Sequence, residues 1–236
     1  MLDEIDTCAH AIREGIPAFT RRNLLFAVRR ARGENIVEES FDAALCERLR
    51  RGPLPGLLPS PCRWIPRRLT REWDAYFPKA VLLVDRPAIL DLFIASGAMP
   101  NARLAVICID GSLAPVVEWL RRGYRAGRRA PVLYLHDAAT VAYPFAFEPL
   151  ATLVRHGSDE PLLYSDLGLP PMGVPARRFA DESLPEGDVL FDLEAVPPAT
   201  LVSHVMRRVL RAVPGDPNML PLTRKDAGQG QEQARR

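Results

Sequence analysis

Three short apolar runs, each followed within two residues by an aspartate, constrain the fold of this chain most strongly. Runs of this length without polar alternation are typical of strands buried on both faces of a parallel sheet. The segments between them, about 88–96 and 113–124, have helical patterns. The order strand, helix, strand, helix, strand therefore predicts an α/β fold with right-handed crossovers. The runs are Ala80–Val84, Leu104–Ile109 and Pro131–Leu135.

Residues 1–50 form a separate helical module in this interpretation. Apolar residues recur at helical spacing in three segments, and Gly15 and Pro17 interrupt the pattern between the first and the second. Thr20 is suited to cap the second helix because its hydroxyl can accept a hydrogen bond from the first turn. Three short helices of this kind are typical of a helix-turn-helix or winged-helix module.

A proline-rich stretch separates this module from the α/β region. Residues 51–70 contain five prolines, which remove hydrogen-bond donors and fix φ, so they predict an extended linker. The α/β domain is expected to span residues 71–215. The end of the chain, residues 223–236, is polar and poor in apolar side chains, which indicates a disordered tail.

Net charge and hydropathy limit the partners of the chain. The 236 residues include 31 Lys and Arg against 29 Asp and Glu, so the formal net charge is only +2. A surface for nucleic acid must then be a local patch. No apolar stretch is long enough to cross a bilayer, and the acidic N-terminus lacks the basic start of a signal peptide. We therefore expect a cytoplasmic protein with no membrane partner.

The aspartates at the strand ends are candidates for a metal site. The carboxyl ends of parallel strands meet at the ligand-binding edge of an open sheet, so Asp85, Asp110 and Asp137 are expected to converge there. Clustered carboxylates repel one another, and Mg²⁺ is the usual counter-ion. The alternative is that each aspartate caps the turn that follows its strand. His136 is a further polar residue at this edge.

Four arginines lie on the polar side of the second helix and are candidates for DNA contacts. Guanidinium groups can grip phosphates or read guanine edges in the major groove of duplex DNA. The alternative is a solvated basic face on an amphipathic helix. The arginines are Arg21, Arg22, Arg29 and Arg30.

The start of the same helix resembles a known family. The stretch Thr20-Arg21-Arg22-Asn23-Leu24-Leu25-Phe26 is similar to the Thr-Lys-Arg-x-x-Tyr-Tyr motif of the topoisomerase VI A subunit and the meiotic double-strand-break protein. Those proteins join a winged-helix domain to a Toprim domain. The resemblance places Phe26 where the family has its strand-transferring tyrosine. Phenylalanine has no hydroxyl, so the resemblance implies that tyrosine-based strand transfer is lost.

The α/β region extends the resemblance over roughly residues 16–145. Asp85 stands where a Toprim domain has its metal-binding glutamate, and Asp110-Gly111-Ser112 resembles the turn after the middle strand. His136-Asp137-Ala138-Ala139 overlies the family's Asp-x-Asp motif, with Ala139 in place of the second aspartate. The resemblance implies a degenerate site that binds Mg²⁺ weakly through Asp85 and Asp137, with Asp110 in reserve.

Taken together, the sequence predicts a DNA-binding protein with a degenerate Toprim-like domain that acts in a DNA-processing or defence complex. Its expected partners are duplex DNA and either another protein or a second copy of the chain, as in the family that it resembles. One alternative is a Mg²⁺-dependent nuclease using Asp85 and Asp137, since the nuclease subunit of the Wadjet defence system also lacks the tyrosine. The other is a non-enzymatic protein-interaction subunit. No catalytic residue is assigned.

Overall fold

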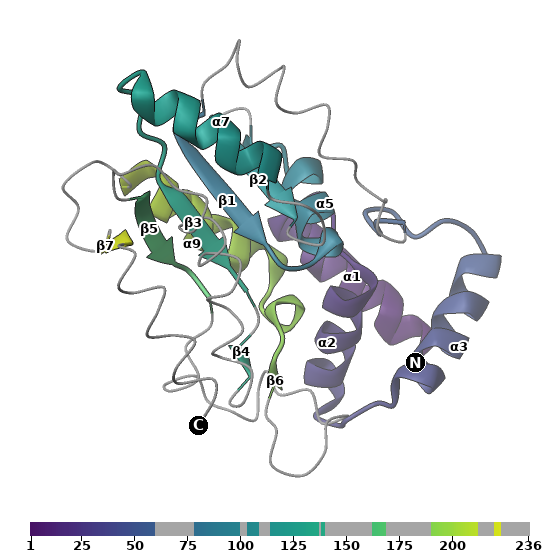
Figure 1. Cartoon of the computed structure of the whole chain (residues 1–236). Helices are drawn as coiled ribbons and strands as arrows, with labels where there is room; N and C mark the ends of the chain where they lie inside the picture. The colour runs from purple at the N-terminus through teal and green to yellow at the C-terminus, as the bar shows by residue number, and fades with distance from the viewer. Residues whose placement is uncertain are drawn as a thin grey trace.

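The structure is a computed structural model, shown in Figure 1, and it places three helices beside a mainly parallel sheet. It describes residues 1–59, 78–99, 103–108, 114–136, 138–139, 162–168, 190–211 and 220–222. The predicted tail 223–236 and two of the three predicted metal ligands, Asp110 and Asp137, lie outside the described residues.

The α/β fold is confirmed. The larger sheet has the strand order β2-β1-β3-β5-β7, in which the first four strands are parallel and β7 is antiparallel to β5. β4 (Ala138–Ala139) and β6 (Leu190–Phe191) form a separate antiparallel pair. The strands of the larger sheet are β1 (Ala80–Val84), β2 (Leu104–Cys108), β3 (Val132–Leu135), β5 (Leu162–Asp166) and β7 (Leu220–Leu222).

The two crossover connections place β2 and β3 on opposite sides of β1. The chain passes from β1 through α5 (Pro87–Ala95) to β2, then through α7 (Ala114–Arg125) to β3 on the other side of β1. The gap between β1 and β3 is therefore the topological switch point of the sheet, where open α/β folds bind their ligands.

Alternate residues of each central strand enter two different cores. Leu82 and Val84 of β1 pack in a core with side chains of α5 and α9 (Pro198–Arg211), whereas Val81 and Leu83 pack in a core with side chains of α7. The strands are buried on both faces because helices cover both. This burial explains why their sequences are continuously apolar instead of alternating.

The N-terminal residues form a helical module with a core of its own. Its helices are α1 (Leu2–Gly15), α2 (Arg21–Arg32) and α3 (Glu38–Arg50), and they enclose Phe19, Leu24 and Phe41, among others. A capping box formed by Thr20 and Asn23 begins α2, as the sequence around Thr20 predicts. Gly33 ends this helix in the left-handed region, at φ 69°.

The first part of the predicted linker packs onto this module. Leu54 is buried in the helical core, and Phe19 exchanges backbone hydrogen bonds with Gly56 (2.9 Å) and Leu58 (2.9 Å). The described residues of this stretch, 51–59, therefore belong physically to the module, and residues 60–70 lie outside the described part of the chain.

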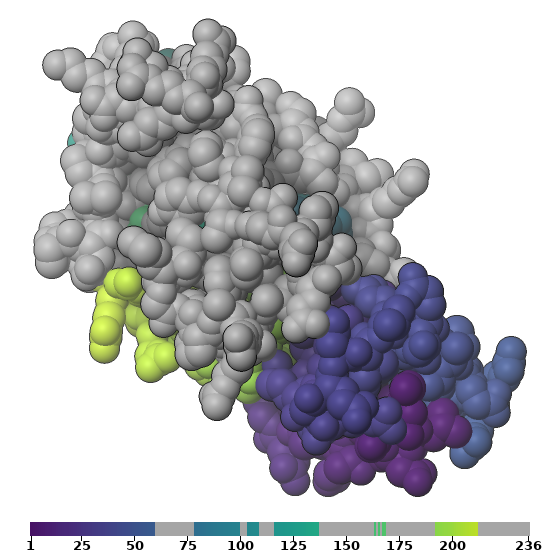
Figure 2. Space-filling model, turned by 90° about the horizontal axis from the view of Figure 1, so that it is seen from below, coloured from purple at the N-terminus to yellow at the C-terminus, as the bar shows by residue number. Residues whose placement is uncertain are grey.

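The helical module lies directly against the α/β part. Ile16, at the end of α1, enters the same core as β1, α5 and α9, and α1 contacts α9. Seen from below, the purple helices lie beside the yellow-green segment that contains α9 (Figure 2). Within the described residues, no helix is both long enough and apolar enough to span a membrane.

Candidate functional site

The carboxyl edge of the sheet brings the ends of β1 and β3 together. These strands are parallel neighbours with Val84 opposite Leu135, so Asp85 and His136 occupy the next positions on the same edge. Asp85 is partly buried and His136 is buried. The strand adjacency that the predicted metal site requires is present.

The metal site itself stays a prediction. Of its three predicted ligands, only Asp85 belongs to the described residues. Among those residues, no group of three or more His, Cys, Asp or Glu side chains is arranged to hold a metal ion. The role of Mg²⁺ therefore rests on the resemblance to Toprim domains and not on coordination geometry.

His136 is held at this edge by close packing. Its imidazole stacks at a tilt against Tyr134, with 4.7 Å between the ring centroids. On another side it meets the backbone of Gly168, just after β5, where an added Cβ would lie 2.2 Å from Nε2. Glycine at 168 is therefore required by this close approach and not by an unusual φ.

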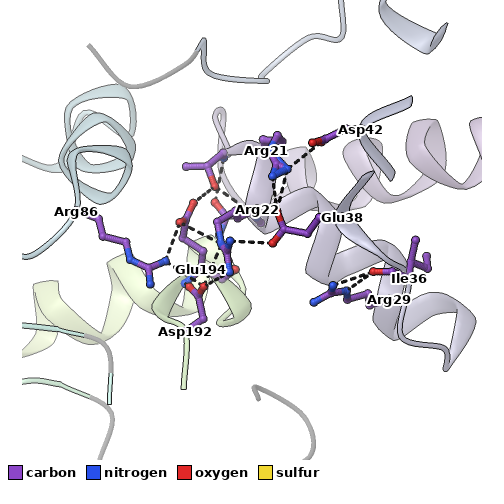
Figure 3. A network of polar contacts seen from close by, with 11 residues as sticks. Arg21, Arg22, Arg29, Ile36, Glu38, Asp42, Arg86, Asp192 and Glu194 are labelled. Carbon is purple, nitrogen blue, oxygen red and sulfur yellow. Dashed lines mark hydrogen bonds and ion pairs between the residues drawn. The ribbon is translucent and has the colours of Figure 1, made fainter. Parts of the chain in front are cut away.

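The arginines at the beginning of α2 are engaged inside the protein. Arg21 forms ion pairs with two side chains of α3, Glu38 at 2.6 Å and Asp42 at 2.8 Å. Arg22 pairs with Glu38 at 2.9 Å and with Asp192, on the other side of the interface, at 2.6 Å. Figure 3 shows these contacts.

The arginines further along α2 also have partners within the chain. Arg29 donates from Nε and Nη2 to the backbone carbonyl of Ile36, at 3.0 and 2.8 Å. Arg30 donates to the carbonyl of Ala195, at 2.6 Å. The predicted role of the four arginines in DNA binding is not tested by these contacts, but the contacts give each guanidinium group a structural role.

Phe26, which the predicted resemblance aligns with a tyrosine, faces inward. It is 4 % exposed. The guanidinium carbons of Arg22 and Arg29 lie 5.7 and 5.3 Å from the centroid of its ring, within the range of cation–π attraction. The aromatic ring is therefore a packing element between two arginines.

Two buried carboxylates connect the module to the α/β part. Asp192 caps the short helix η4 (Leu193–Ala195) by accepting a hydrogen bond from the backbone N–H of Glu194 at 2.8 Å. Its Oδ2 atom accepts hydrogen bonds from Arg22, at 2.6 and 3.0 Å, and from Arg86, at 3.0 Å. Asp192 is fully buried, so these two guanidinium groups replace the water that it loses.

Glu194 makes the second half of this connection. The hydroxyl of Thr20 donates to its Oε1, and Arg86 donates to its Oε2 at 3.4 Å. The side chain of Asn23 donates to its backbone carbonyl at 2.8 Å. Burial raises the pKa of Glu194, and the nearby Asp192 adds to the increase, whereas Thr20 and the two arginines oppose it. We call Thr20, Arg22, Arg86, Asp192 and Glu194 the interface cluster.

Sequence reasoning missed the interface cluster. It treated Thr20 as a helix cap and Arg22 as a DNA contact, and it assigned no role to Arg86, Asp192 or Glu194. The available signal was the pair of acids, Asp192 and Glu194, placed among the apolar residues of the stretch 189–196. A charge in such a position needs a partner, but the sequence does not say which one.

A second polar surface lies at the amino edge of the sheet, opposite Asp85. The stretch 120–130 contains five arginines and no acid. It ends α7 and leads into β3. The adjacent strand β1 and the next strand, β2, are preceded by Lys79 and Arg103. We define the amino-edge basic surface by its exposed members, which are Lys79, Arg103, Arg122, Arg125, Arg128 and Arg129.

Comparisons of the chain with protein-family models, curated proteins and solved structures find no match.

The interface cluster predicts unequal effects for two neighbouring arginines. Arg22→Met leaves fully buried Asp192 with only part of its charge compensation, so we expect a loss of about 3 kcal/mol in the free energy of unfolding. Arg21→Met removes half-exposed ion pairs and should cost less than about 1 kcal/mol. Urea unfolding at pH 7, followed by circular dichroism, measures both. Equal losses would contradict the role of Asp192.

Glu194 predicts a specific dependence of stability on pH. Its pKa in the folded protein is raised above the ordinary value of 4.5, so above pH 4.5 the folded state retains the proton longer than the unfolded state. The stability of the wild type relative to Glu194→Gln should therefore fall as the pH rises from 4.5 through the raised pKa. Urea unfolding of both proteins across this range tests the sign, and parallel profiles would refute it.

The contact between Gly168 and His136 predicts a coupled pair of substitutions. Gly168→Ala forces the imidazole to move and should lower the free energy of unfolding by about 2 kcal/mol. In the background of His136→Ala the same change should cost less than about 0.5 kcal/mol, because the ring that it meets is absent. A double-mutant cycle measures the coupling. Additive effects would show that the two residues are not in contact.

Proposed function

We propose that this chain is a DNA-binding protein with a degenerate Toprim-like domain, without tyrosine-based strand transfer, acting in a DNA-processing or defence complex. The observation that carries the proposal is the amino-edge basic surface, because clustered exposed arginines are the electrostatic footprint of nucleic-acid binding. The order of helical module and parallel sheet, and the phenylalanine at position 26, support the same interpretation.

We place further phosphate contacts at the amino-edge basic surface, beside those predicted for α2. Arg21, Arg22, Arg29 and Arg30 hold partners within the chain, and binding a phosphate would compete with those bonds. The amino-edge surface spans the beginnings of three adjacent strands, about 10 Å across at the usual strand spacing. Phosphate contacts there would position the DNA backbone and carry no reading of the sequence.

An alternative explanation of the same arginines is local. Cations in the last turn of a helix stabilise it by opposing the negative end of its dipole, and Arg122 and Arg125 lie in the last turn of α7. This role predicts that replacing the two arginines lowers the stability of the protein and leaves its affinity for DNA unchanged. The two explanations are separated by measuring both quantities on the same variants.

The test is fluorescence anisotropy with a labelled DNA duplex at several salt concentrations. For Arg122→Gln combined with Arg125→Gln we expect weaker binding and a salt slope reduced by about 2, roughly 1 for each phosphate that the variant no longer neutralises. Arg50→Gln combined with Arg51→Gln is the matched control, because these exposed arginines lie at the end of α3. It should bind like the wild type.

Two results would contradict the proposal. One is no salt-dependent binding of the wild type to duplex DNA. The other is an unchanged affinity and salt slope in the α7 variant, which would leave the arginines with their role at the end of the helix. Nicking of supercoiled plasmid in Mg²⁺ or Mn²⁺, measured alongside, would instead support the nuclease alternative.

A further inference from the structure

A cavity of about 480 Å³ lies where the helical module meets the beginning of α5. This volume falls in the range of small-molecule sites, about 300–1,000 Å³. It is far too small for a nucleic-acid duplex. Its lining shares no residue with the amino-edge basic surface. The cavity is bounded by residues of both parts of the protein, and its shape therefore depends on the interface cluster.

Part of the lining of the cavity is apolar. Leu45 from α3 and the residues Leu57, Leu58 and Pro59 line it from the module, and Ala88 lines it from α5. Such a wall gains free energy by excluding water when it meets the apolar body of a ligand. A ligand that is polar all round would leave these side chains with no compensating contact.

Charged side chains also line the cavity, and those of Arg22 and Arg86 are already paired with Asp192 and Glu194. Three guanidinium groups line it, those of Arg21, Arg22 and Arg86, against the carboxylates of Asp91 and Glu194. In Figure 3, Arg86 approaches Glu194 from one side and Arg22 from the other. Protonation of Glu194 would remove its negative charge from the lining. Burial raises the pKa of this carboxyl group, which favours the protonated form.

Arg21 has donor capacity left for a ligand. Its Nη1 and Nη2 atoms bond to Glu38 and Asp42, and these contacts lie on the side of α3. Its Nε atom donates no hydrogen bond among the described residues. The side chain is 36 % exposed, so an incoming anion can reach it without breaking the buried bonds of Asp192.

We propose that this cavity binds a small amphipathic anion, with its apolar body against the wall of Leu45, Leu57 and Leu58 and its anionic group at the guanidinium of Arg21. The proposal does not depend on DNA binding. It assigns the ligand by chemical class, because the lining combines apolar side chains with the guanidinium group of Arg21, whose Nε atom is a remaining donor.

The probe is 1-anilinonaphthalene-8-sulfonate, an aromatic sulfonate whose fluorescence increases in apolar surroundings. We expect saturable binding at one site per chain and a higher melting temperature of the folded protein. Its uncharged analogue N-phenyl-1-naphthylamine should bind more weakly. Binding of many probe molecules without saturation, or equal affinity for the two probes, would overturn the proposal.

Two variants locate the site. Ala88→Trp fills the cavity from α5 and should abolish saturable binding. Arg21→Gln should weaken the sulfonate about tenfold, as expected for the loss of one charge-assisted hydrogen bond, and leave the uncharged probe unaffected. Arg50→Gln is the control for general loss of charge. Circular dichroism checks folding, and if Ala88→Trp does not fold, Arg21→Gln alone decides. Unchanged sulfonate affinity in Arg21→Gln would overturn the proposal.

Discussion

The burial of Asp192 and Glu194 is the constraint on which the arrangement of the two parts depends. Two carboxylates out of contact with water are tolerable only with cationic and hydroxyl partners around them. Those partners come from α2 and from the beginning of α5, so the acids are compensated only when the helical module sits where it does. Apolar contacts alone would allow the module to slide, because they have no direction. The interface cluster adds that direction.

The same requirement explains why both the apolar and the polar side of α2 are in contact with other parts of the chain. The inner side of α2 packs inside the module through Leu24, Leu25 and Val28, and its polar side binds η4 through Arg22, Asn23 and Arg30. A helix with both sides occupied has little surface left for a third partner. The contacts of α2 within the chain therefore fix its orientation between the module and η4.

Much of the architecture could be predicted from local patterns, and the candidate site could not. The three central strands follow from continuous apolar runs, and the helices follow from their spacing, because both signals lie within about 15 residues. The partners of Arg22 and Arg86 are Asp192 and Glu194, separated from them by 106 to 172 residues of chain. No local pattern encodes such a pairing. A basic helix face looks the same in sequence whether it meets DNA or a distant buried acid.

The surroundings of Phe26 have a consequence for any substitution at this position. The ring is enclosed and held between the guanidinium groups of Arg22 and Arg29, each tied to a further partner. Phe26→Tyr would add a hydroxyl to a ring that is 4 % exposed. A single substitution at position 26 would therefore not place a tyrosine hydroxyl at the surface while these contacts persist.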